Sequence, residues 1–354
     1  MPVVPLLPFD SRHVTLMADF DPARWEQHLA LGRVHGIAGR WHRLLGNANL
    51  LDRVAPQVCN HLWSEHLVAA ERERMARWEA NRISHAFRDA DFPVVLLKGA
   101  AYILCGLPPG NARIVADVDI LVPLTRLAEA EQILHRHGWQ PSAKSSYDEH
   151  YYREWMHEIP PLQHIARGAV LDVHHNILPR TSRLCPNAAD LIDQAQDVSG
   201  SGLKVLAPAD MVLHSVVHGF YSGEFGNCFR DLLDIHELVS HFVARSPGFW
   251  PQLLARIHHF RFERPAFYAL RYCARHLGTA VPSSFMQELT AYAPAQPVLR
   301  AMDWAIARVF LPALPPTLAQ RVAAYGLYIR SHWIKMPPPL LARHLWTKYR
   351  MRRD

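Results

Sequence analysis

The chain has 354 residues, of which 49% are hydrophobic and 20% are charged. This is the composition of a globular protein, and it excludes an intrinsically disordered chain, which would combine low hydrophobicity with high net charge. The length predicts two or three domains. The formal net charge of +6 is compatible with anionic partners such as nucleotides or nucleic acid, but charge alone identifies no activity.

The cysteines and the N-terminal residues bear on the compartment. Five cysteines are scattered along the chain without a Cys-x-x-Cys pair, which is typical of reduced thiols: Cys59, Cys105, Cys185, Cys228 and Cys273. The first residues lack a basic segment followed by a long apolar core, and no apolar run approaches the roughly 18 residues that span a bilayer. We therefore expect a cytoplasmic protein without a membrane span.

The first elements in chain order are helices followed by a strand. Residues 22–91 repeat apolar side chains among charged ones at helical spacing, until Pro93 breaks the pattern. The apolar run 94–97 then predicts a short buried strand. It ends at Lys98-Gly99, after which residues 100–104 can open a helix. A strand that leads through a glycine into a helix can direct backbone N–H groups at an anion.

Further strands and many helices follow. Residues 117–122 predict a second strand, and residues 124–137 predict a helix that Gly138 ends as a cap. Residues 151–176 alternate enough to predict two or three more strands in a mixed or antiparallel sheet. Beyond Pro179 the pattern is almost entirely helical. The helices expected there span residues 210–220, 229–243, 251–260, 265–277, 282–292, 297–310 and 318–334.

This order of elements predicts an α+β fold in which helices flank a small mixed sheet. We expect a helical N-terminal region over residues 1–90, a core with the sheet over residues 91–178, and a helical C-terminal domain over residues 179–354.

A pair of carboxylates begins the second predicted strand. Asp117 and Asp119 are two residues apart, so in a strand they point to the same face about 6 to 7 Å apart. At an effective dielectric near 20 two such charges repel by roughly 2 to 3 kcal/mol, and a cation would relieve this repulsion. Magnesium prefers carboxylate and phosphate oxygens.

A third carboxylate, Asp172, lies in a later predicted strand, with His174 on the same face. If the two strands are neighbours, Asp117, Asp119 and Asp172 converge. The alternative for each residue alone is structural: the first two acids pair with Arg113 or another base, and Asp172 lies in a turn.

Several of these segments together resemble a known family. Their order and spacing are similar to the uncharacterised nucleotidyltransferase family of the DNA polymerase beta superfamily, over roughly residues 90–240. The similar segments are Leu96–Ala101, Arg113–Val122, Leu134–Trp139, Leu171–His174, His214–Gly219 and Arg230–Asp234.

The resemblance implies a polymerase-beta-type mixed sheet on which Asp117, Asp119 and, less directly, Asp172 hold two divalent ions, Mg²⁺ or Mn²⁺. It also implies transfer of a nucleoside monophosphate from a nucleoside triphosphate to an acceptor, with release of pyrophosphate. The acceptor is open: a small molecule, a sugar phosphate, a peptide or a protein would fit. The superfamily has Gly-Ser where this chain has Gly99-Ala100, so a phosphate-binding hydroxyl is missing.

Four further residues are candidates for nucleotide binding. Lys98 and the backbone after Gly99 can supply positive charge and N–H groups in place of the missing hydroxyl. Arg113 is a candidate phosphate ligand, with an ion pair to Asp117 as the alternative. His174 shares the face of the carboxylates.

Two other functions stay open. The first is a catalytically inactive nucleotide-binding or toxin–antitoxin-type interaction protein that keeps the fold. The second is a basic nucleic-acid-binding protein, which we consider possible but do not favour.

The remaining signals have structural explanations that we prefer. His214 and His218 have a spacing that can bind zinc but lack the glutamate of a metalloprotease motif, and we expect packing or substrate contact. We expect Asp231 and Asp234 to cap a helix and form local ion pairs, although a domain closing over the nucleotide would also use them.

The C-terminal residues 333–353 interleave Trp333, Trp346 and Tyr349 with basic side chains. Such a segment could contact RNA or an anionic membrane surface, but we expect an amphipathic helix that packs its aromatic side chains on the domain.

Overall fold

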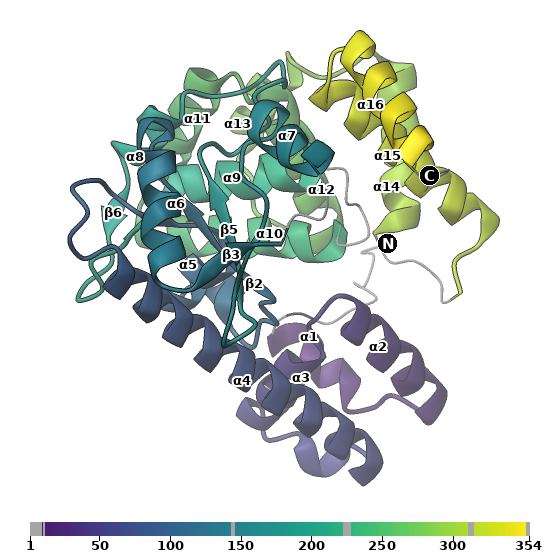
Figure 1. The fold of residues 1–354 in the computed structure, drawn as a ribbon. Helices are drawn as coiled ribbons and strands as arrows, with labels where there is room; N and C mark the ends of the chain where they lie inside the picture. Colours follow the sequence, from purple (N-terminus) through teal and green to yellow (C-terminus); the bar gives the residue numbers. More distant parts are fainter. Residues whose placement is uncertain (1–8, 10, 143–145, 222–227, 311–314, 352–354) are drawn as a thin grey trace.

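The structure is a computed structural model that describes residues 9, 11–142, 146–221, 228–310 and 315–351. It is an α+β fold with a seven-stranded mixed sheet, as the sequence predicts (Figure 1). No helix in these ranges is long and apolar enough to cross a membrane.

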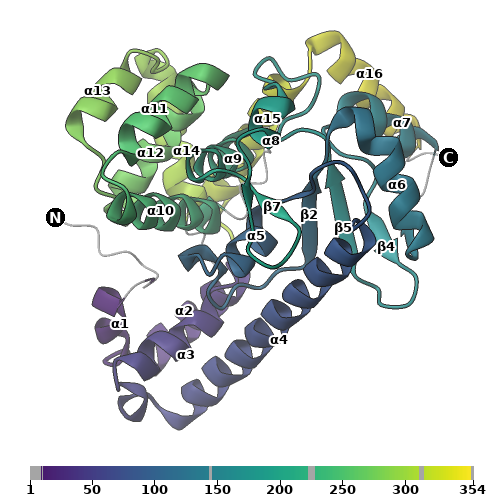
Figure 2. The same cartoon turned by 90° about the vertical axis from the view of Figure 1, so that its left-hand side faces the viewer.

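The N-terminal part is a set of helices ending in the longest helix of the described chain. The helices are α1 (Ser11–Met17), α2 (Pro22–Val34), α3 (Ala38–Asn47) and α4 (Pro56–Ala86), with the short 3₁₀ turn η1 (Leu51–Arg53) before α4. The N-terminal half of α4 packs with α3 and is linked to α2 by the Arg33–Glu65 ion pair, and its C-terminal half runs beside the sheet (Figure 2). One helix thus connects the N-terminal bundle to the core.

The sheet has the strand order β3-β4-β5-β2-β1-β7-β6. Its strands are β1 (Val95–Leu96), β2 (Asp117–Leu121), β3 (Trp139–Pro141), β4 (Leu162–His164), β5 (Val170–His174), β6 (Gln196–Asp197) and β7 (Lys204–Val205). The β2–β5 and β1–β7 pairs are parallel, and the other pairs are antiparallel.

Helices and turns connect these strands. They are α5 (Lys98–Leu104), η2 (Pro108–Gly110), η3 (Leu124–Arg126), α6 (Leu127–Arg136), α7 (Ser146–Trp155) and α8 (Ala188–Ile192). Gly138 follows α6 with φ +87°, the left-handed conformation that a glycine cap supplies. The prediction of a helix ended by Gly138 is confirmed.

Two parts of the sequence prediction are wrong. Residues 151–155, expected in a strand, belong to α7, where Arg153 pairs with Glu149 one turn earlier and with Glu131 of α6. These ion pairs suit a helix docked beside α6. The strands β6 and β7 lie in the region expected to be helical, and each has only two residues, too few for a periodic pattern.

The C-terminal part consists of eight helices in the described residues. They are α9 (Pro208–Tyr221), α10 (Cys228–Arg245), α11 (Phe249–Phe260), α12 (Glu263–Leu277), α13 (Ser283–Thr290), α14 (Gln296–Val309), α15 (Leu318–Lys335) and α16 (Pro338–Met351). The seven helices predicted from residue 210 to 334 match α9 to α15 to within a few residues at each end.

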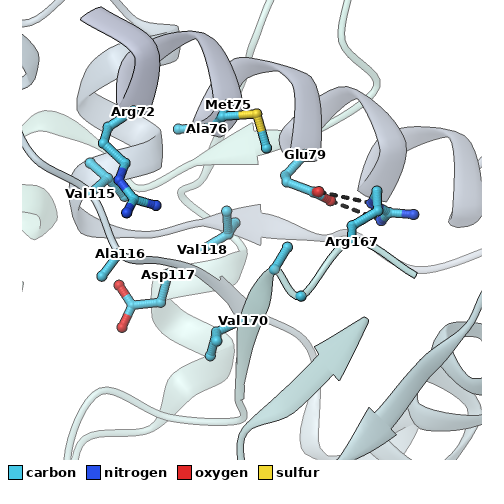
Figure 3. A pocket seen from close by; sticks show the side chains of 12 residues that line it. Arg72, Met75, Ala76, Glu79, Val115, Ala116, Asp117, Val118, Arg167 and Val170 are labelled. Atoms are coloured by element: carbon cyan, nitrogen blue, oxygen red, sulfur yellow. Dashed lines mark hydrogen bonds and ion pairs between the residues drawn. The ribbon is translucent and has the colours of Figure 1, made fainter. Parts of the chain in front are cut away.

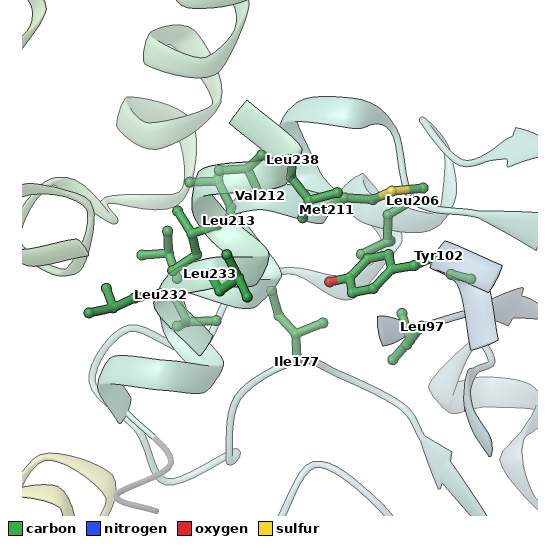
Figure 4. Close-up of a cluster of buried hydrophobic side chains, with 14 of the residues drawn as sticks. Leu97, Tyr102, Ile177, Leu206, Met211, Val212, Leu213, Leu232, Leu233 and Leu238 are labelled. Atoms are coloured by element: carbon green, nitrogen blue, oxygen red, sulfur yellow. The ribbon is translucent and has the colours of Figure 1, made fainter. Parts of the chain in front are cut away.

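One continuous hydrophobic core joins the sheet to the C-terminal helices. Tyr102 on α5 lies beside Leu97 after β1 and near Met211 of α9, and Leu213 of α9 and Leu233 of α10 lie farther along the same cluster (Figure 4). The buried Tyr102 hydroxyl lies 2.7 Å from the Ser215 hydroxyl of α9, so its polar end is satisfied. This packing fixes α5, which carries Lys98, against both the sheet and α9.

Candidate functional site

The sheet brings the three predicted carboxylates to one face. Strands β2 and β5 are parallel neighbours, and Asp119 lies opposite Asp172 in their register. Because side chains alternate along a strand, Asp117 shares the face of Asp119, and His174 shares the face of Asp172. The alternate residues, including Val118, point to the other face, which α4 covers (Figure 3). The condition for convergence of the three carboxylates, that the two strands are neighbours, is met.

Asp119 is buried and contacts two basic side chains. The Lys98 ammonium donates to its Oδ1 over 2.9 Å, and His174 Nε2 lies 3.0 Å from the same oxygen. Burial would raise the pKa of Asp119, but Lys98 and His174 outweigh it and hold that pKa well below its usual range. Asp119 is therefore ionised, and its charge organises the site.

The same contacts shift the pKa values of the two bases. Burial alone would lower the pKa of Lys98, yet Asp119, with Glu158 and Asp117, raises it. For His174 burial also lowers the pKa, and Glu158 and Asp119 reverse this to a net rise. The same contacts therefore favour the charged forms of both basic groups.

The carboxyl groups of Asp172 and Asp117 are compensated only in part. Among the described residues neither forms an ion pair with a lysine or arginine, and Asp172 Oδ1 is buried without a hydrogen-bond partner. Burial, followed by the charges of Asp119 and Glu158, raises the pKa of Asp172 to about 7. Burial and Asp119 also raise the pKa of Asp117. Lys98 and His174 lower the pKa of Asp117, and His174 lowers that of Asp172, but neither effect offsets the rise, so the charged forms of both carboxyl groups are disfavoured in the protein alone.

The backbone at Lys98 and Gly99 is constrained. Lys98 has φ +44°, in the left-handed region that is costly for a side chain. A Cβ at Gly99 would lie 3.0 Å from Val115 Cγ2 and 3.2 Å from Arg113 Nε. The close approach of Gly99 and the strained φ of Lys98 together direct the lysine toward β2.

Arg113 is engaged by a residue of the C-terminal helices. Its Nη1 donates to both oxygens of Asp234 on α10, and its guanidinium lies 5.5 Å from the centre of the Tyr102 ring. The alternative of an ion pair between Arg113 and Asp117 is therefore wrong, and so is the expectation that Asp234 pairs locally. The pair instead ties the loop before β2 to α10, as does Arg230, which donates to the Ile114 carbonyl.

A hollow lies between α4 and the beginnings of β2 and β5. Arg72 of α4, Val115 and Asp117 line it, beside the Glu79–Arg167 ion pair (Figure 3). The Asp117 carboxylate points away from α4, toward the face of the sheet that carries Asp119. Asp117 therefore lies at the open edge of the site.

A family model described as an uncharacterised nucleotidyltransferase matches residues 21–278. The chain belongs to this nucleotidyltransferase family. The match confirms the resemblance and extends it to both sides, from α2 to the end of α12. No curated protein and no solved structure matches the chain.

Sequence reasoning missed two residues beside this candidate site. His157 and Glu158 pair with the end of β5, where Ile159 N donates to Val173 O and His175 N to His157 O. Glu158 Oε2 thereby lies 3.4 Å from His174 Nε2. His157, Glu158 and His174 each offer a ligand atom within 4.8 Å of the others, an arrangement that could hold a metal ion.

The remaining candidates lie around the site. Buried His214 of α9 has its pKa held well below the usual range by burial and then by Lys98. The Nδ1 atom of His218, one turn later, lies 3.7 Å from Asp231 Oδ1. The sequence also suggests that the segment 219–226 forms one side of a cleft; residues 219–221 belong to α9, and residues 222–226 lie outside the described part of the structure.

The expected packing of the C-terminal aromatic side chains is wrong for two of the three. Trp333 is 55% exposed and Trp346 is 62% exposed, whereas the side chain of Tyr349 lies outside the described part of the structure.

Proposed function

We propose that this nucleotidyltransferase transfers a nucleoside monophosphate from a nucleoside triphosphate to an acceptor, releases pyrophosphate, and requires Mg²⁺ or Mn²⁺. The observation that carries the proposal is the register of β2 and β5, which sets Asp119 beside Asp172 with Asp117 on the same face. Family membership supplies the reaction class, and these acids supply the ligands for the ions.

The donor atoms fit divalent cations. Asp172 Oδ1 is a buried acceptor without a donor, and a metal ion would supply the missing positive partner. His174 Nε2 lies 3.0 Å from Asp119 Oδ1 and 3.4 Å from Glu158 Oε2. Adjacent ligands around an ion bound at about 2.1 Å are separated by roughly 3.0 to 3.4 Å, so this spacing suits a shared ion.

Divalent ions bound here would neutralise the triphosphate and align its α-phosphorus with the acceptor oxygen. The protein's own part is to hold the ligands in place. Asp119 is fixed between Lys98 and His174, and Lys98 is in turn fixed by the constrained backbone before Gly99. A site held this rigidly stabilises charge without reorganising during the reaction.

Lys98 and Gly99 are assigned to the phosphates. The Lys98 ammonium reaches Asp119 and can contact a phosphate oxygen from the same position, because an ammonium has three N–H donors. Arg113 is assigned a positioning role through Asp234. Nitrogen donors at His157 and His174 beside the carboxylates favour Mn²⁺ over Mg²⁺, because Mg²⁺ prefers oxygen ligands only.

The test is label transfer. Each of the four nucleoside triphosphates, labelled at the α-phosphate, is incubated with the full chain, Mg²⁺ or Mn²⁺, and fractions of a cell extract that separate metabolites from macromolecules. We expect label to enter one fraction together with pyrophosphate release. Label in the metabolite fraction identifies a small-molecule acceptor, and label in the protein fraction identifies a polypeptide.

Matched variants separate chemistry from folding. Asp119→Asn should reduce transfer by at least about a thousandfold, because it removes a fixed charge at the reacting phosphate. Asp193→Asn, the same change at an exposed position after α8, should leave transfer unchanged. Nucleotide binding without transfer in any fraction, and equal in Asp119→Asn, would instead indicate the inactive nucleotide-binding protein.

A further inference from the structure

The positive charge of the chain is concentrated beyond α14. Residues 311–354 contain eight of the 38 lysines and arginines but only one of the 32 acidic residues, Asp354. The first 310 residues therefore have 30 basic and 31 acidic side chains and a net charge of −1. The family match ends at residue 278, so this basic segment lies outside it.

Helix α15 in this segment has two apolar faces. Ala323, Leu327 and Ser331 form its buried side, which packs toward α9 and α14. On the opposite side five apolar side chains recur at helical spacing and are at least half exposed; we call them the α15 stripe. They are Leu318 (71% exposed), Val322 (55%), Tyr325 (65%), Ile329 (52%) and Trp333 (55%).

Such a surface is unusual for a helix whose other side is already packed. An ordinary surface helix turns polar residues outward, and contiguous exposed apolar patches mark interaction sites. The same two helices carry exposed basic side chains, Arg321 on α15 and Arg343 and Arg350 on α16. In Figure 1 both helices lie at the outer edge of the molecule, away from the N-terminal bundle.

We propose that α15 and α16 form a docking surface for an anionic lipid bilayer. Apolar and aromatic side chains on one side of a helix, flanked by arginines and without acids, are the features of helices that lie in the headgroup region. Each basic residue near an anionic leaflet contributes about 1 kcal/mol, or roughly a fivefold gain in binding.

The composition of the stripe favours lipid over the other possible partners. RNA would use the arginines and stack on Tyr325 or Trp333, but it gains little from Leu318, Val322 and Ile329, which have no ring to stack on. A second copy of the chain would bring the same basic surface against itself, and the like charges would repel. Acyl chains and anionic headgroups match both the apolar and the basic side chains.

The experiment measures sedimentation of the full chain with vesicles of phosphatidylcholine alone or mixed with phosphatidylglycerol. We expect binding only to the anionic vesicles, weakening as salt is raised. Val322→Glu should weaken binding by roughly tenfold, because it places a charge in the apolar stripe. Val68→Glu on α4 is the matched control, since Val68 is 48% exposed there, and it should bind like the parent chain.

The charge contribution is tested separately. Replacing Arg321 and Arg343 together with glutamine should weaken binding by about 25-fold if the two contributions add. Thermal melting of each variant establishes that it folds. The proposal is overturned if the parent chain does not bind anionic vesicles, or if Val322→Glu binds as well as Val68→Glu. It is equally overturned if the arginines bind RNA independently of Val322, or if Val322→Glu dissolves a dimer.

Discussion

Asp119 of β2 and Asp172 of β5 are partners in the register of two parallel strands, and the pKa values of their carboxyl groups are shifted in opposite directions. Asp119 is held ionised by Lys98 and His174, whereas burial and the charge of Asp119 raise the pKa of Asp172 to about 7. Two acids of one site with such different pKa values are characteristic of functional clefts. The difference leads to separate predictions for the residues around each acid.

Lys98→Met should affect metal and nucleotide binding in opposite directions. The lysine competes with a metal ion for Asp119 Oδ1, 2.9 Å from its ammonium, so its removal should tighten binding of Mn²⁺ alone by several-fold. It should also weaken binding of a triphosphate by roughly tenfold or more, because a phosphate contact is lost. Isothermal titration with Mn²⁺ and then with nucleotide measures both. Weaker binding of both would show that Lys98 only supports the fold.

Asp172 should make the metal-free protein less stable as pH rises. With a pKa near 3.9 unfolded and about 7 folded, the native state retains a proton that the unfolded state has lost between these values. The free energy of unfolding therefore falls with rising pH across this window and levels off above pH 7. Asp172→Asn cannot ionise, so above pH 7 it should be more stable than the parent chain by on the order of 2 to 4 kcal/mol.

Urea unfolding in the presence of a chelator, at pH 4.5 and pH 7.5, checks this prediction. The difference between Asp172→Asn and the parent chain should grow with pH, and the exposed Asp193→Asn should show no such trend. A constant difference at both pH values would mean that Asp172 is ionised throughout.

The sequence allowed the local parts of the site to be predicted. The two-residue spacing of Asp117 and Asp119 is a property of any strand, and the cap at Gly138 depends only on neighbouring residues. The pairing of β2 with β5 required the family resemblance, because no local pattern states which strands are neighbours. The sequence predicts a strand over Tyr151–Trp155 because aromatic residues favour strands. The segment is helical instead, and the ion pair of Arg153 with Glu131 of α6 stabilises that helix.

Long-range contacts could not be predicted in the same way. Glu158 reaches His174 because the segment before the Pro160-Pro161 turn pairs with β5, and that pairing has no local signal. Arg113 and Asp234 lie 121 positions apart, and each has nearer residues of opposite charge in the sequence. In both cases the packing of helices and strands against one another determines which residues pair.

Breaking the Arg113–Asp234 pair should destabilise the protein strongly. The two side chains are 13% and 9% exposed, so Arg113→Ala leaves a nearly buried carboxylate without its partner, at a cost of about 3 to 5 kcal/mol. The double variant Arg113→Met/Asp234→Leu should be less destabilised than the sum of the single changes. Arg33→Ala breaks the exposed pair with Glu65 and should cost only a few tenths of a kcal/mol. Urea unfolding measures each of these variants together with the single changes Arg113→Met and Asp234→Leu, and additive effects of the two single changes would contradict a direct coupling.

Gly99→Ala should reduce both stability and nucleotide binding, although alanine is the better helix former. A helical Gly→Ala change ordinarily stabilises by about 0.5 to 1 kcal/mol. At Gly99 the new Cβ would lie 3.0 Å from Val115 Cγ2 and 3.2 Å from Arg113 Nε. Either the loop before β2, which contains Arg113 and Val115, or α5 must therefore move. Such overpacking costs about 1 to 3 kcal/mol and outweighs the helical gain.

The displacement at Gly99 also shifts the adjacent Lys98. Gly99→Ala should therefore weaken triphosphate binding as well as lower the free energy of unfolding. Gly326→Ala is the matched control, because Gly326 lies within α15 and its added Cβ would meet nothing within 4 Å. That variant should be slightly more stable than the parent chain and should bind nucleotide equally well. If Gly99→Ala matched Gly326→Ala in both measurements, the close approach of Gly99 to Val115 and Arg113 would have no role in holding Lys98 in place.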